Sequence, residues 1–119
     1  MRATYALEAL LEMADGADDR APGGAVTLAL CGRWDHEPPC PEAPHHTGTE
    51  RAGTRLRVRV LFAVDPARET AVRDRIEAAL ATGHLVGPDG VTSEWRLVST
   101  ADSAVRAAES DHADRLRRG

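Results

Sequence analysis

The chain has 119 residues, a mass of 12.8 kDa and a formal net charge of −4. Its 29% charged and 42% hydrophobic residues are typical of one globular domain over residues 1–119. No apolar run approaches the ~20 residues that span a bilayer, and residues 1–24 lack the apolar core of a signal peptide. We therefore expect a cytoplasmic protein, and the acidic net charge disfavours nucleic acid as its partner.

The N-terminal segment, residues 1–14, is predicted to form an amphipathic helix. Ala3, Ala6, Leu7 and Leu10 recur at the i, i+3, i+4, i+7 spacing that marks one helical face. Residues 15–24 contain three Gly, one Pro and three Asp without any period, which predicts a linker.

Two strands are predicted next, over residues 25–34 and 55–64. In the second strand, five apolar residues alternate with arginines: Leu56, Val58, Val60, Phe62 and Val64 against Arg55, Arg57 and Arg59. Such alternation indicates an antiparallel sheet with one buried face. We expect the arginine face to be solvated or to contact acidic residues such as Glu8 and Glu12, because it lacks aromatic residues for stacking on nucleic acid bases.

A central helix is predicted to begin at Asp65-Pro66, since Asp is a good N-cap and Pro suits the first helical position. Its apolar stripe consists of Val72, Ile76, Ala79 and Leu80. Residues 93–99 should form a third strand, and residues 101–117 a weak last helix with His112 on its apolar side. The predicted fold class is therefore α+β, in the order α-β-β-α-β-α. It has a small three-stranded sheet, one central amphipathic helix and terminal helices.

The long loop predicted between the first two strands, residues 35–54, holds most of the chemistry-bearing side chains. His36, Cys40, His45 and His46 lie in it among several prolines. Imidazole nitrogen and thiolate sulfur are the ligands that zinc prefers in tetrahedral sites. The leading hypothesis is a small metal-binding protein, with zinc as cofactor and these four residues as ligands. Cys31 is a further candidate, which the extended geometry of the preceding strand disfavours.

Other interpretations of the same loop stay open. The protein is alternatively a metal-free accessory or protein-interaction subunit that uses the Pro-rich loop and the sheet face. A third hypothesis is a small metal- or thiol-dependent enzyme, in which Cys40 is the nucleophile or a nearby glutamate the base. A Cys31–Cys40 disulfide is the remaining alternative, disfavoured in a reducing cytosol.

The chain has few large apolar residues to form a core, and a small sheet has unpaired edge strands. Both features favour self-association. We expect a homodimer or another protein partner, with Leu7, Leu10 and Leu11 at or near the interface.

Overall fold

The computed structural model describes residues 1–32 and 43–118. Within them, five strands form one antiparallel sheet in the order β2-β3-β1-β5-β4. The strands are β1 (Ala3–Met13), β2 (His45–Ala52), β3 (Arg55–Val64), β4 (His84–Val86) and β5 (Thr92–Ser103). The helices are α1 (Ala21–Cys31), α2 (Glu69–Ala81) and α3 (Ser110–Arg118), with short 3-10 turns η1 (Pro66–Arg68) and η2 (Ala107–Glu109). Of these described helices, none has the length and apolarity required to cross a membrane.

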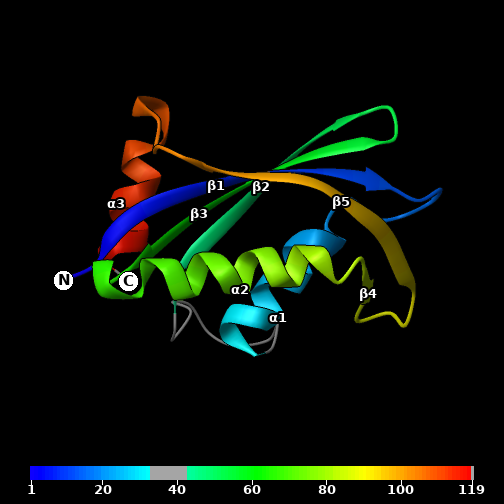
Figure 1. Ribbon diagram of the computed structural model, residues 1–119, viewed down its shortest axis with the longest axis horizontal. Helices are drawn as coiled ribbons and strands as arrows, with labels where there is room; N and C mark the ends of the chain where they lie inside the picture. The colour runs from blue at the N-terminus through cyan, green and yellow to red at the C-terminus, as the bar shows by residue number, and fades with distance from the viewer. Residues whose placement is uncertain (33–42, 119) are drawn as a thin grey trace.

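The sheet is curled, and α1 and α2 pack side by side against one of its faces (Figure 1). The third helix, α3, contacts β1 and β3. It lies on the opposite face, which we call the open face. Strand β3 lies between β1 and β2, and β1 lies between β3 and β5. Helix α1 therefore joins the parallel strands β1 and β2 across the antiparallel β3, as in a split βαβ unit. Helix α2 leads through the short edge strand β4 to β5, which is parallel to β3 across β1.

The main core lies between the sheet and the helices α1 and α2. The alternating apolar residues of β3 and the predicted stripe of α2 are all buried in it, as the sequence predicted. A smaller apolar layer lies under α3 on the open face, where Ala6, Leu61, Ala63 and Ala113 are buried. The strand over residues 55–64 and the helix that follows Asp65 are therefore confirmed, and the Asp65 side chain accepts a hydrogen bond from the backbone N–H of Ala67 at 3.0 Å.

The N-terminal segment is a strand, so the predicted helix over residues 1–14 is wrong. Its alternate residues Tyr5, Leu7, Ala9, Leu11 and Met13 point into or against the core. Ala, Leu, Glu and Met favour helices, but β1 is a central strand that pairs with both β3 and β5. That pairing overrides the weak local propensity. Because Leu7 and Leu11 are fully buried inside the chain, they do not lie at a dimer interface as expected.

The segment predicted as linker and first strand contains α1 instead. Pro22 stands in the first turn of α1, and Gly32 ends it with φ +79° and an N–H that donates to the Leu28 carbonyl. Both features are ordinary signals of helix ends. The alternation of Val26, Leu28 and Leu30 suggested a strand because α1 is apolar around most of its circumference and shows no clear stripe.

The rest of the predicted order is corrected at three places. Residues 45–52 form the strand β2 within the predicted loop, joined to β3 by a two-residue turn in which Gly53 has φ +63°. The predicted third strand over residues 93–99 is confirmed but extends to Ser103, which delays the last helix to Ser110. Short β4 completes five strands rather than three, and the order begins with a strand.

Candidate functional site

The two neighbouring histidines of the candidate metal site lie on β2, where consecutive side chains point to opposite faces. His45 is in register with Phe62 of the main core, whereas His46 is in register with Leu61 of the open face. The two imidazoles are therefore separated by the sheet. They do not act as ligands of one ion in this arrangement.

His45 faces α1, and both of its ring nitrogens contact the protein. Its Nδ1 lies 3.0 Å from the Ala43 carbonyl oxygen, and its Nε2 lies 3.1 Å from the Thr27 hydroxyl. The carbonyl only accepts, so Nδ1 carries the proton and Nε2 accepts from the hydroxyl. This pattern places His45 in a structural role between β2 and α1.

His46 faces the opposite way and meets His112 from the first turn of α3. The two ring centroids are 4.3 Å apart with an angle of 51° between the ring planes. Within the described part of the chain, neither ring makes a hydrogen bond. The pKa of His46 is lowered from 6.5 by partial desolvation, and to a smaller extent by the neighbouring imidazoles of His112 and His45. Near neutral pH His46 is therefore neutral, which is the form that binds metal ions.

The sequence placed His112 on the inner side of the last helix but gave no reason to join it to His46. The two residues are far apart in the chain and come together because α3 packs on β1 and β3, which brings His112 to His46 on the neighbouring β2. The residues of β2 are mostly polar on both faces, so the sequence shows no alternation of apolar and polar residues there. The face of the sheet on which His46 lies could therefore not be predicted.

The other ligands predicted from the sequence do not lie with His46 and His112 in the described part of the chain. His36 and Cys40 lie outside the described residues. Cys31 is the last residue of α1, on a helix rather than the predicted strand, and it is disulfide-bonded. Its sulfur is therefore not a thiolate ligand, and the disulfide that the sequence disfavoured is the state of this cysteine. Among residues 1–32 and 43–118, no group of three or more His, Cys, Asp or Glu side chains is close enough to hold a metal ion. The described chain therefore offers a pair of imidazoles rather than a complete site.

An ion-pair network on the open face attaches the C-terminal segment to the sheet. Arg59, whose side chain is only 11% exposed, donates to both oxygens of Glu109 at 2.7 and 2.8 Å. It also reaches Glu8 at 3.0 Å and the Ser103 hydroxyl at 2.8 Å. Arg59 is the main cause that lowers the pKa of Glu109 from 4.5 to about 2. Glu109 immediately precedes α3, so this network positions the helix that carries His112.

The predicted contact of the arginine face with Glu8 and Glu12 is confirmed, although both acids lie on a strand rather than a helix. Glu8 pairs with Arg59 and Glu12 with Arg55, at 3.0 and 3.1 Å, and each pair is directly opposite in the β1–β3 register. Cross-strand pairs of opposite charge stabilise a sheet. These ion pairs neutralise two of the three arginines of β3 on this face.

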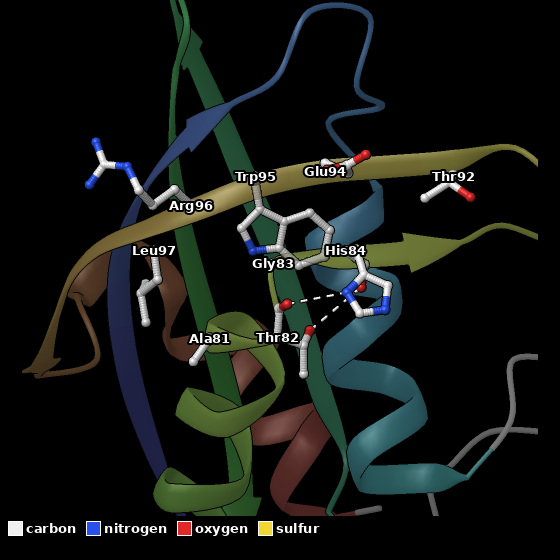
Figure 2. A pocket seen from close by; sticks show the side chains of 9 residues that line it. All are labelled: Ala81, Thr82, Gly83, His84, Thr92, Glu94, Trp95, Arg96 and Leu97. Carbon is white, nitrogen blue, oxygen red and sulfur yellow. Dashed lines mark hydrogen bonds between the residues drawn. The ribbon is translucent and has the colours of Figure 1, made fainter.

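An open hollow of about 680 Å³ lies beside the C-terminal end of α2 and is lined by residues of the paired strands β4 and β5 (Figure 2). The Trp95 ring projects between Leu97 and His84, and its Nε1 donates to the buried Leu80 carbonyl at 2.7 Å. His84 Nδ1 is turned back to the carbonyl oxygen of Thr82 at 3.2 Å. These polar groups bind to their own backbone, so they organise the end of the helix and do not converge on the hollow.

Comparisons with known proteins leave the family open. No protein-family model and no curated protein matches the chain. Among solved structures, it is similar to part of an aminobenzoyl-glutamate utilization protein from Klebsiella pneumoniae. The identity is 15% and the TM-score 0.37, over 93% of this chain and 32% of that protein. The chain thus spans about a third of that protein's length.

Proposed function

We propose that this protein binds a divalent transition metal ion, with zinc as the leading candidate, and that His46 and His112 are ligands. The observation that carries the proposal is the contact of the two imidazoles, whose centroids are 4.3 Å apart and whose nitrogens make no hydrogen bond in the described chain. Imidazole nitrogen is a preferred ligand of zinc, copper and nickel.

The lowered pKa of His46 leaves its imidazole in the form that a metal ion binds. The shift comes mainly from partial desolvation of the ring and, to a smaller extent, from the neighbouring His112 and His45. A metal ion satisfies both rings without adding a proton to either. Because protons compete for the same nitrogens, metal affinity should fall as the solution becomes more acidic than the imidazole range near ~6.5.

This proposal modifies the ligand set predicted from the sequence. His46 is kept, and His112 is added from a different element. His45 is removed because its two nitrogens are used by Ala43 and Thr27. His36 remains a prediction, and zinc has four positions to fill, so it is compatible with the pair. Cys40 is the only cysteine of the sequence besides the disulfide-bonded Cys31, so it is compatible only with the disulfide reduced.

The test is isothermal titration calorimetry, which measures the affinity of metal-free, untagged protein for Zn²⁺ at pH 7.5. His46→Ala and His112→Ala should each lower the affinity at least about tenfold, since even an outer-shell change has that effect. His84→Ala is the matched control, because His84 is exposed on β4 at the opposite edge of the sheet. Loss of binding in none of the three variants, or equal loss in all three, would contradict the proposal.

A further inference from the structure

The described chain supplies two ligands for the proposed ion, and the free edge of β2 suggests where a third comes from. Among residues 1–32 and 43–118, β2 is the last strand of the sheet, and its one strand partner there is β3. The outward backbone groups of such an edge are a template for another strand. We infer that two copies of this protein pair through β2, and that Glu50 of the partner subunit completes the site of His46 and His112. This inference rests on the proposed function.

The hydrogen-bond pattern of β2 determines which residues are available for pairing. The two-residue turn makes Ala52 and Arg55 a hydrogen-bonded pair, and the Ala63 N–H donates to the Pro44 carbonyl at 2.9 Å. Even-numbered residues of β2 therefore direct their backbone groups toward β3. Thr47, Thr49 and Arg51 direct theirs outward.

A two-fold interface brings two identical strands together in antiparallel order, and the outward residues must face each other. One such register has Gly48 at the two-fold axis, Thr47 opposite Thr49, and His46 opposite Glu50. The alternative of equal length, centred on Thr49, places no acid opposite His46. Only the first register therefore brings a carboxylate to the imidazole pair.

Distance decides between the two copies of Glu50. Within one chain, Glu50 is four residues from His46 along the strand, which is about 13 Å at 3.3 Å per residue. Directly opposite residues on paired strands have Cβ atoms about 5 Å apart. Even-numbered residues of β2 share the open face, so the carboxylate of the partner subunit reaches the side on which His112 lies.

The ligand chemistry and the charges fit this arrangement. Two histidines and one glutamate, with water in the fourth position, are a known zinc ligand set. Glu50 is exposed and makes no ion pair within the described residues. On the opposite face the register places His45 against Arg51, whose charge is already bound by Asp19 at 2.6 Å. The carboxylate of Asp19 thereby reduces the repulsion that the Arg51 guanidinium would exert on a positively charged group across the interface.

The experiment is sedimentation velocity of full-length protein at about 50 μM, with Zn²⁺ at one equivalent or with EDTA, beside titration of the metal. We expect the 12.8 kDa chain to double in mass when zinc is added. Glu50→Gln should abolish the zinc-dependent dimer and weaken metal affinity about tenfold, while Glu94→Gln on β5 should change neither.

A second variant separates the edge from the ligand. Thr49→Pro removes an outward N–H, a change that edge strands tolerate, and should abolish the dimer while the weaker binding by one chain persists. Zinc binding by a protein that stays monomeric would overturn the inference and leave the proposed function standing. A zinc-dependent dimer unaffected by Glu50→Gln would also overturn it, as would loss of the dimer on His36→Ala alone. Absence of zinc binding altogether would refute the proposed function itself.

Discussion

The attachment of α3 to the sheet depends on Arg59. Substitution of Arg59 by alanine should therefore lower the free energy of unfolding by an amount that the structure allows us to calculate. Arg59→Ala leaves Glu8 and Glu109 without the guanidinium that bridges them and removes a largely buried side chain. Breaking a fully buried ion pair costs about 3–5 kcal/mol, and the partial exposure of both acids reduces this to about 2–4 kcal/mol. The measurement is the urea midpoint at pH 7.

The pH dependence of the unfolding free energy of Arg59→Ala tests whether the loss of stability comes from the ion pair with Glu109. The pKa of Glu109 is lowered in the folded protein, so its carboxylate stabilises the fold above pH 4.5, and this contribution is lost as the pH falls toward 2. A drop from 4.5 to about 2 corresponds to about 3 kcal/mol. Solvent screening of the partly exposed carboxylate leaves about 1–2 kcal/mol. The stability difference between the native protein and Arg59→Ala should shrink by about 60% of this amount between pH 7 and pH 3, because the rest is lost only as the pH falls through the folded pKa of about 2.

Arg57→Ala is the matched control, because Arg57 lies on the same strand and face but is exposed and makes no ion pair within the described chain. Its cost should stay within about 0.5 kcal/mol at both pH values. Equal costs for the two arginines, or a pH-independent cost for Arg59→Ala, would refute the reasoning. Of the two variants, only Arg59→Ala should lower zinc affinity, since Arg59, unlike Arg57, binds Glu109 directly before the helix of His112.

Two further substitutions test local details of the packing by chemical unfolding. Gly83→Ala should cost more than Gly90→Ala: both have positive φ, but a Cβ at Gly83 would meet the Trp95 carbonyl oxygen at 2.8 Å, while nothing lies near Gly90. Thr47→Val should be neutral or stabilise by up to about 1 kcal/mol, because the buried Thr47 hydroxyl has no hydrogen-bond partner among the described residues. Thr27→Val should cost about 1 kcal/mol, since it breaks the bond to His45. Equal effects within either pair would contradict the packing described above.

The elements that the sequence predicted correctly are those with one consistent signal. In β3, five apolar residues alternate with arginines, and a strand is the only regular structure that separates them onto two faces. In α2, the Asp65 cap and the spacing of Val72, Ile76 and Leu80 agree with each other. Local preference and tertiary packing support the same structure there.

The elements that were missed carry conflicting signals. The pattern of β1 satisfies a helical stripe at Ala3, Leu7 and Leu10 and also a strand face at Leu7, Leu11 and Met13. The segment becomes a strand because it pairs with both β3 and β5. These partners come from distant parts of the chain, so the local sequence does not reveal the pairing. In α1 the end signals Pro22 and Gly32 were present, but a helix buried on most sides offers no stripe to count.

The candidate site was partly predictable, and strand geometry explains the limit. His112 was not predicted as a ligand, and His46 was found by residue type alone, which treats His45 and His46 as equivalent neighbours. On β2 they differ completely: one fixes the strand to α1, and the other meets His112 on the open face. Because strand side chains alternate, a shift of one residue in the β2–β3 register would exchange these roles. The two-residue turn at Gly53 sets that register, and Arg59 with Glu109 brings α3 to the same face. The imidazole pair is therefore a consequence of one turn and one ion-pair network, and both depend on contacts between strands and helices that the sequence around the histidines does not show.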